Sequence, residues 1–385
     1  MVKDGDIAGA VIAISRRGQL VHTAVIGEQD VATHTPLRED SIFRIYSMTK
    51  AFTGVAMMQL FEEGKWRLDD PVAKFVPQFA NLKVAVGEDA QGNFVVEDAH
   101  HPMTMRELMT HTAGFTYAYF NQTKVERTYD AVKLEDPDQT LQQLIDKLAR
   151  IPLNAQPGEK WHYSIGADVQ GYIVEKLSGQ SLADFMRERI FIPLRMVDTG
   201  FYVPEKDWSR LTTTYVYGAD HRLIAFPQNV PDHDFRYPPK YYSGGNGAVT
   251  TARDFLRFEQ MLLNSGELDS VRILAADSIK LMMHNALPSA VHETEPGKAW
   301  GLGFAVVTSP AKAQVPYGKG TVYWNGAAGT WFWVDPRNDL AVAGMVQQWS
   351  TPDAPDFFAA SNRLIYRALL DRRGVEPAYY DKNKP

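Results

Sequence analysis

The chain has 385 residues, a length that suggests two or three structural units. Of these residues 45% are hydrophobic and 22% are charged, which is typical of a globular protein with a buried core. Its 40 basic and 46 acidic residues give a net charge of −6, and no block of Lys and Arg could follow a phosphate backbone, so we expect no nucleic-acid partner. Cysteine is absent, which excludes disulfides, thiolate metal sites and a cysteine nucleophile.

A membrane-spanning helix is not expected, because no apolar run approaches the roughly 20 residues that such a helix needs. The apolar stretch 8–14 follows Asp4 and Asp6, with no basic segment before it and no cleavage site after it. It therefore lacks the pattern of a signal peptide. On this basis we expect a cytoplasmic protein, and the sequence leaves a periplasmic or secreted location open.

The N-terminal part predicts a hairpin followed by a helix. Two β-branched runs, 11–14 and 20–26, flank a short polar turn that contains Gly18, which is typical of a β-hairpin. From residue 48 onward the apolar residues recur at helical spacing, which predicts a helix that opens at Ser47 and ends at Gly64. Ser47 is therefore also a candidate helix N-cap.

The middle of the chain predicts helices and loops, and strand signals return near the C-terminus. Because strands cluster at both chain ends, we expect one sheet built from the two ends, in an α/β domain of residues 1–66 and 245–385 with a mainly helical domain, 67–244, inserted between them. The expected helices are 104–110, 141–151, 168–177, 181–190, 252–263 and 361–370, the expected strands are 301–307, 321–324, 330–334 and 340–347, and 203–242 is expected to be irregular.

Several common kinds of site lack their sequence motifs. The ten histidines include no H-E-x-x-H or other short metal-ligand spacing, and no phosphate-binding glycine motif is present, so we expect no metal and no nucleotide cofactor. His111 is expected to be a packing residue at a helix end. The nearest approach to G-x-S-x-G begins with His162 in place of Gly, which argues against an α/β-hydrolase triad.

Ser47 and Lys50 form an S-x-x-K motif at the start of the predicted helix. Side chains three residues apart on a helix are neighbours at about 5–6 Å, so Lys50 can reach the Ser47 hydroxyl and supply the base that a serine nucleophile needs. The backbone N–H groups of a helix N-terminus also suit an oxyanion. A second copy, Ser309 to Lys312, is expected in a hairpin loop without an apolar helix behind it, which favours the first copy.

Together with later motifs, this S-x-x-K resembles serine β-lactamases, penicillin-binding proteins and their esterase relatives. The aromatic segment 161–164 and Trp324-Asn325-Gly326 follow in the order that this superfamily uses. Stretches 108–114, 193–196 and 244–252 are similar to the class C β-lactamase branch, and within it the chain most resembles the family VIII carboxylesterases. The resemblance implies a β-lactamase/transpeptidase-like fold of the α/β (α+β) class, with an antiparallel sheet flanked by helices and an inserted helical domain.

Two motifs depart from the class C pattern. The middle motif keeps Tyr163 but has Ile165 where class C enzymes have Asn. The K-T-G motif is replaced by Trp324-Asn325-Gly326, close to the W-G-G of esterase members, so the cationic Lys is lost and the Gly is kept. A literal Tyr-x-Asn at 323–325 lies in the predicted strand and is interpreted as coincidence.

The resemblance assigns roles residue by residue. It implies that Ser47 is the nucleophile and that Lys50 and Tyr163 share the proton transfer, and which of the two is the formal base stays open. The backbone N–H groups of Ser47 and Ala327 would form the oxyanion hole. The substrate-binding residues would be Trp324, Asn325 and Gly326.

We therefore expect a serine carboxylesterase that hydrolyses small, short-chain carboxylic esters through an acyl-serine intermediate, without a cofactor. A β-lactamase, a D-amino-acid peptidase or an acyltransferase would use the same serine. A non-catalytic binding relative is a further alternative, which the joint presence of Ser47, Lys50 and Tyr163 argues against. The physiological ester, the stereoselectivity and the oligomeric state are not given by the sequence.

Overall fold

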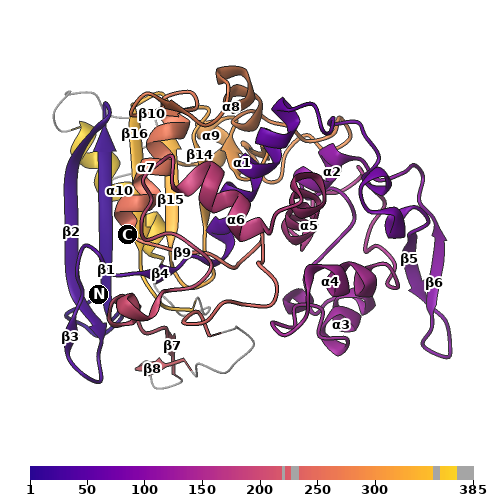
Figure 1. Cartoon of the computed structure of the whole chain (residues 1–385), viewed down its shortest axis with the longest axis horizontal. Coiled ribbons are helices and arrows are strands. Elements are labelled where there is room, and N and C mark those ends of the chain that lie inside the picture. The colour runs from indigo at the N-terminus through magenta and orange to yellow at the C-terminus, as the bar shows by residue number, and fades with distance from the viewer. Residues whose placement is uncertain (219–221, 227–233, 350–355, 371–385) are drawn as a thin grey trace.

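The computed structural model describes residues 1–218, 222–226, 234–349 and 356–370, and its centre is an eight-stranded antiparallel sheet (Figure 1). The strand order is β12-β13-β14-β15-β16-β1-β2-β3. The strands are β1 (Gly9–Arg16), β2 (Gln19–Asp30), β3 (Thr35–Pro36), β12 (Lys298–Trp300), β13 (Ala305–Val307), β14 (Val322–Asn325), β15 (Trp331–Asp335) and β16 (Leu340–Met345).

The two chain ends meet in the middle of this sheet, as the sequence predicts. β1 pairs with β2 in the predicted hairpin and on its other edge with β16, in a register that runs from Val11 opposite Met345 to Arg16 opposite Leu340. In Figure 1 the indigo N-terminal strands accordingly lie beside the orange and yellow C-terminal ones. Of the predicted strand 301–307 only the last three residues form a strand, β13, while residues 301–304 are the turn that joins it to β12.

Side chains alternate across the central strands and so separate two cores. Val11 and Ala343 belong to the large core, together with helices α1 (Thr49–Glu62) and α7 (Ala252–Leu263). Val342 faces the other way, into a smaller core under α10 (Phe357–Leu370). Because successive residues of a strand point to opposite faces, covering both faces with helices makes β16 apolar at nearly every position.

Helix α1 runs through the large core and presents the first half of the S-x-x-K motif. Every residue from Thr49 to Leu60 is buried, which matches a helix that is apolar around most of its circumference. The helix ends as predicted, with Gly64 at a φ of 75° just beyond it. Its start differs from the prediction, because residues 46–48 form a separate 3₁₀ turn and Met48 is the N-cap. Ser47 does not cap the helix, since its hydroxyl is used elsewhere.

The segment 67–244 carries most of the remaining helices, on the side of the sheet opposite to β2 in Figure 1. It also contains two hairpins that the sequence reading missed, β5 (Lys83–Glu88) with β6 (Phe94–Asp98) and β7 (Tyr215–Tyr217) with β8 (Leu223–Ala225). The division into two domains stays a prediction. The helices are α2 (Met105–Met109), α3 (Lys124–Ala131), α4 (Leu141–Leu148), α5 (Gly166–Ser178) and α6 (Leu182–Met186), the last continued by a π turn over Arg187–Phe191.

Two further pairs of short strands lie outside the central sheet. β4 (Phe43–Arg44) pairs with β9 (Val249–Thr250), and β10 (Glu267–Leu268) pairs with β11 (Val271–Arg272). Helices α8 (Ala276–Met282) and α9 (Pro310–Ala313) lie between the late strands. Of the predicted irregular section, residues 219–221 and 227–233 lie outside the described ranges, as do residues 371–385 of the predicted α/β domain.

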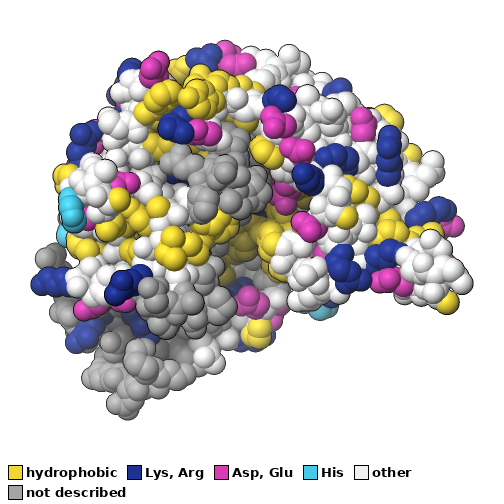
Figure 2. Space-filling view, turned by 90° about the horizontal axis from the view of Figure 1, so that it is seen from below, with side chains coloured by type: hydrophobic (Ala, Val, Ile, Leu, Met, Phe, Trp, Pro, Cys, Tyr) yellow, Lys and Arg dark blue, Asp and Glu magenta, His cyan; other side chains and the backbone are white. Residues whose placement is uncertain are grey.

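Seen from below Figure 1, the surface is hollowed between the part that carries the sheet and the part that carries the inserted helices, and hydrophobic side chains gather around the hollow (Figure 2). No helix in the described ranges is long and apolar enough to cross a membrane.

Candidate active site

Ser47 lies on a strained turn between β4 and α1. The preceding residue, Tyr46, has a φ of 42°, the left-handed region that non-glycine residues rarely occupy. Its ring is buried against Trp349, with 5.0 Å between centroids, and this packing holds the unusual backbone. Such conformations cost on the order of 1–3 kcal/mol and concentrate where a side chain must be presented in one direction. Here the side chain so presented is the hydroxyl of Ser47.

The Ser47 hydroxyl contacts two polar groups. Lys50 Nζ, one helical turn on, donates a hydrogen bond to Ser47 Oγ at 3.3 Å. Ser47 Oγ in turn donates to Oδ1 of Asn246 at 3.1 Å. Lys50 Nζ also donates to the backbone carbonyl of Gly245 at 2.9 Å. The serine and the lysine are therefore held together by one segment that lies almost 200 residues further along the chain.

That segment, residues 243–248, is tied to α1 along its length. Thr53 Oγ1 donates to the carbonyl of Gly244 at 2.7 Å, and the backbone N–H of Ala248 donates to Thr49 Oγ1 at 3.1 Å. The approach is so close that a Cβ on Gly244 would lie 2.5 Å from the carbonyl oxygen of Ala167. Glycine is required there because it lets the loop backbone pass between α1 and α5.

Lys50 is only 2% exposed and lies between aromatic faces. Its Nζ is 4.7 Å from the ring centroid of Tyr163 and 5.3 Å from that of Tyr117. A buried ammonium is costly unless its charge is compensated, and the negative faces of two phenol rings supply part of that compensation together with the Gly245 carbonyl.

A buried carboxyl, Asp168, lies behind this arrangement in the first turn of α5. It is fully buried, and burial raises its pKa, while the hydrogen bond from Ser243 and the charge of Lys50 oppose the rise. Its Oδ1 accepts from Ser243 Oγ at 2.5 Å and from the N–H of Gly245 at 3.4 Å. Asp168 thus fixes the loop that contacts Ser47 and Lys50.

Tyr163 is held by neighbours that the sequence did not connect to it. Trp324 Nε1 donates to the Tyr163 hydroxyl at 3.2 Å, and the two rings pack at 5.1 Å. His111 packs on the other side at 4.9 Å, with its Nδ1 3.0 Å from Ser164 Oγ. Burial, followed by the charge of Lys50, holds the pKa of His111 well below its usual 6.5, so the imidazole is neutral at physiological pH. His111 is thus a buried packing residue that also forms part of the site wall.

The segment 324–327 lies at the end of β14, against the turn that carries Ser47. A Cβ on Gly326 would be 2.4 Å from the carbonyl oxygen of Ile45, so only glycine permits this contact. Asn325 and Ala327 are exposed, whereas Trp324 is half-buried. This places the predicted oxyanion donors, the N–H groups of Ser47 and Ala327, on two adjoining segments, and their role stays a prediction.

The second S-x-x-K motif differs from the expectation in one respect. Ser309 precedes a four-residue helix, α9, so the motif is not purely a hairpin loop. The reason is Pro310, which fits the first position of a helix. Lys312 is 66% exposed and its Nζ lies 3.6 Å from Glu293. Ser309 is half-buried and Lys312 is exposed, so the second motif lacks the buried lysine of the first.

Sequence reasoning missed Asn246, Tyr117 and Asp168 as members of the site. For Asn246 the sequence did hold an indication, the run Ser243-Gly244-Gly245-Asn246-Gly247. Such a run of small residues around one amide is typical of a backbone that approaches another element closely. Tyr117 and Asp168 carry no such signal, since one more tyrosine or a carboxyl in a first helical turn is ordinary.

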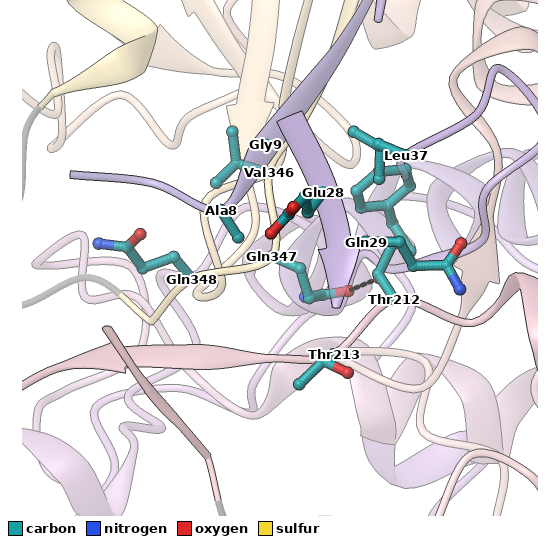
Figure 3. Close-up of a pocket in the computed structure, with 11 residues that line it drawn as sticks. Ala8, Gly9, Glu28, Gln29, Leu37, Thr212, Thr213, Val346, Gln347 and Gln348 are labelled. Carbon is teal, nitrogen blue, oxygen red and sulfur yellow. Dashed lines mark hydrogen bonds between the residues drawn. The ribbon is translucent and has the colours of Figure 1, made fainter. Parts of the chain in front are cut away.

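The cavity drawn in Figure 3 lies elsewhere, where the ends of β1 and β2 meet residues 212–213 and 346–348. The Gln347 side chain points across it to Thr212, whose Oγ1 donates to Gln347 Oε1 at 3.1 Å. The same oxygen accepts from the N–H of Arg44 at 2.8 Å. These contacts join strands and loops, so we interpret this cavity as a structural junction. In the described ranges no group of three or more His, Asp or Glu could hold a metal ion.

Comparisons with known proteins agree on one family. The family model described as Beta-lactamase matches residues 1–363. Protein Rv1367c of Mycobacterium tuberculosis is 36% identical over 361 residues, which cover 89% of this chain and 86% of the relative. Esterase EstB of Burkholderia gladioli is 29% identical over 363 residues, with 89% and 86% covered. The solved structure of EstCE1, a hydrolase with promiscuous acyltransferase activity, has a TM-score of 0.79 at 26% identity and covers 95% of each chain.

The chain therefore belongs to the beta-lactamase family of serine hydrolases. The predicted β-lactamase/transpeptidase-like fold, an antiparallel sheet flanked by helices with helices inserted between its halves, is confirmed.

Proposed function

We propose that this member of the beta-lactamase family is a carboxylesterase that hydrolyses short-chain, neutral carboxylic esters through an acyl-Ser47 intermediate. The observation that carries the proposal is the contact of Lys50 Nζ with Ser47 Oγ at 3.3 Å in a buried site walled by aromatic rings. A buried lysine one turn from a serine on a strained turn meets the requirements of an activated nucleophile. Relatives that include esterase EstB support the same class of substrate.

The proposed reaction has two half-reactions. Ser47 Oγ attacks the ester carbonyl carbon, and its proton passes to Tyr163, or to Lys50 if the lysine acts as an unprotonated amine, and from there to the leaving alkoxide. The tetrahedral oxyanion would be stabilised by the backbone N–H groups of Ser47 and Ala327. Water then attacks the acyl-serine, the same groups take its proton and return it to Ser47 Oγ, and the carboxylic acid leaves.

The choice of esters over β-lactams rests on the residue at the end of β14. Penicillins and cephalosporins carry a carboxylate, which a lysine in the third motif would attract, and this chain has Trp324 there. Trp324 uses its only N–H on the hydroxyl of Tyr163. Loss of one charge-assisted hydrogen bond costs about 1.5–3 kcal/mol, which is roughly a ten- to hundredfold loss of affinity.

The nucleophile is tested by Ser47→Ala. We expect this variant to lose hydrolysis of p-nitrophenyl butyrate and labelling by a fluorophosphonate, because the hydroxyl that forms the acyl bond is gone. The matched control is Ser309→Ala, which removes the serine of the exposed second motif and should keep wild-type rates. Mass spectrometry of the labelled wild type should place the adduct on Ser47. Normal turnover by a folded Ser47→Ala protein would refute the assignment.

The substrate class is tested by comparing kcat/KM for p-nitrophenyl butyrate and for nitrocefin. We expect the ester to be the better substrate by at least a hundredfold, because the aromatic wall favours an apolar acyl group and offers no cation for the cephem carboxylate. A higher kcat/KM for nitrocefin would make the chain a β-lactamase instead. Product analysis with an added alcohol measures how much of the acyl group is transferred to alcohol rather than to water.

A further inference from the structure

We propose that Asn246 is a positioning residue of this site: its side-chain amide, oriented by Glu135, directs the hydroxyl of Ser47 so that Oγ stays beside Lys50. The proposal rests on the proposed function only in taking Ser47 as the nucleophile. It adds to the site a residue that the sequence analysis included in the stretch 244–252 but gave no role.

The hydrogen bonds around Ser47 leave its proton one described direction. Lys50 Nζ is a donor without acceptor capacity, so at 3.3 Å it occupies a lone pair of Ser47 Oγ. The hydroxyl proton points to the other contact, Oδ1 of Asn246 at 3.1 Å. If the amide were flipped, an NH₂ group would face an oxygen that already accepts from an ammonium, and the acceptor for the hydroxyl would be lost.

Glu135 selects the orientation of the amide. Asn246 Nδ2 donates to Oε1 of Glu135 at 3.4 Å, a long hydrogen bond across the site from the segment between α3 and α4. An ionised carboxylate only accepts hydrogen bonds, so the NH₂ end of the amide faces Glu135 and the oxygen faces Ser47. The half-buried glutamate thereby fixes which atom of Asn246 the nucleophile meets.

The backbone of Asn246 is fixed independently of its side chain. Its N–H donates to Ser243 Oγ at 2.9 Å, and that hydroxyl donates to the buried Asp168. The neighbouring carbonyl of Gly245 accepts from Lys50. The loop therefore orients the Ser47 hydroxyl through the side chain of Asn246, and it positions Lys50 through the main-chain oxygen of Gly245. Misplacing a reacting atom by about 1 Å can cost a hundredfold in rate, so an alignment of this kind has a measurable effect.

The experiment measures how fast a fluorophosphonate reacts with Ser47, at several concentrations, so that the maximal rate and the half-saturating concentration are separated. We expect Asn246→Ala to lower the maximal rate about 10- to 100-fold with little change in the half-saturating concentration. Asn246→Asp should lower it further, because the new carboxylate faces Glu135. Adding Glu135→Gln to Asn246→Asp restores a hydrogen bond in which the amide at position 135 donates and the carboxylate at position 246 accepts. The maximal labelling rate of this double variant should be at least tenfold higher than that of Asn246→Asp alone.

The control is Asn264→Ala, at the exposed C-terminal end of α7, which should label at the wild-type rate. Thermal unfolding and near-ultraviolet circular dichroism identify any variant that fails to fold, and the recovery by a second substitution cannot come from a misfolded chain. Wild-type labelling of Asn246→Ala, or no recovery in the double variant, would overturn the proposal. Labelling of Ser47 without ester turnover would refute the proposed function alone, whereas an unreactive Ser47 in the wild type would refute both.

Discussion

Lys50 shows at the scale of one residue what burial demands of a charged group. Its ammonium has few contacts with solvent, and its described neighbours are a hydroxyl, a carbonyl and two phenol rings. These groups stabilise the charge without pairing it directly with a carboxylate. The same contacts keep Nζ of Lys50 beside the hydroxyl of Ser47, where a serine nucleophile needs an adjacent base.

This arrangement predicts how substitutions of the two proposed proton-transfer residues combine. Lys50→Ala and Tyr163→Phe should each reduce the acylation rate by roughly 10²–10⁴-fold, the usual contribution of a general acid or base. Because the Lys50 ammonium lies over the Tyr163 ring, the two act as one unit and the double variant should be little slower than the worse single variant. Pre-steady-state release of p-nitrophenol measures acylation directly. Losses that multiply would show that the two residues act independently.

The sequence predicts the parts of the site that are local and misses the parts that are distant. Ser47 and Lys50 are three residues apart, so helix geometry alone predicts their contact. Tyr163 and Trp324 were predicted only from the order of motifs in the family that the chain resembles. Nothing in the sequence around either residue predicts their contact across 161 positions. Asn246 contacts Ser47 across 199 positions. Its glycine-rich run indicates a close backbone approach, but only the folded chain shows that the approach is to Ser47.

At the scale of elements, helix periodicity predicts α7 to the residue, whereas boundaries set by tertiary contacts are missed. Residues 252–263 have a strong amphipathic repeat and a Thr251 cap, and helix formation there is a local property. The hairpin of β5 and β6 was missed because its strands are short and three of its four valines are exposed, so no buried alternation marks it. The start of α1 shifted because the turn at Tyr46 is stabilised by packing.

Helix α7 also contains a buried carboxyl, Glu259, that none of the proposed chemistry uses. Glu259 is fully buried, and neither carboxyl oxygen has a hydrogen-bond partner in the described part of the chain. Burial raises its pKa well above the usual 4.5, so the folded state keeps the proton that the unfolded state releases. The contribution of Glu259 to the free energy of unfolding is therefore fully present below about pH 4.5, and it is lost progressively as the pH rises toward the folded-state pKa.

We accordingly expect Glu259→Gln to remove this decline. As the pH rises from 5 to 8, the free energy of unfolding of the variant should increase relative to that of the wild type, by up to about 1.4 kcal/mol per pH unit. Urea unfolding at pH 5, 6.5 and 8 measures it. Glu267→Gln, in the half-buried β10, is the matched control and should show no such trend. A constant difference across the three pH values would show that Glu259 is ionised in the folded chain.

At the scale of the whole molecule, the proposed catalytic residues depend on strands that contain none of them. The hairpin of β1 and β2 covers one edge of β16, and both cores continue across that contact. A chain that lacks residues 1–30 keeps Ser47, Lys50 and Tyr163 but opens the sheet at its centre.

We expect this shortened chain to lose fluorophosphonate labelling together with its near-ultraviolet circular dichroism. Buried apolar surface contributes about 25 cal/mol per Å², and the stability of a domain is only about 5–15 kcal/mol. Losing the apolar contacts that β1 and β2 make in both cores, together with the pairing along the edge of β16, should therefore exceed that stability. Wild-type labelling by the shortened chain would show that the remaining strands and helices fold without their N-terminal partners.

The pairing of β1 with β16 has a consequence for how the protein is made. The first strand leaves the ribosome long before its partner exists, and at about 5–20 residues per second the interval is roughly 20 to 60 s. Throughout that time the hairpin offers a hydrogen-bonding edge of eight residues, Gly9–Arg16, that any other nascent strand could occupy. Ser47 and its helix are synthesised early but stay unsheltered until the last strands arrive. Synthesis of an active molecule therefore depends on keeping this edge free of wrong partners, which makes its yield sensitive to translation rate, growth temperature and the supply of chaperones.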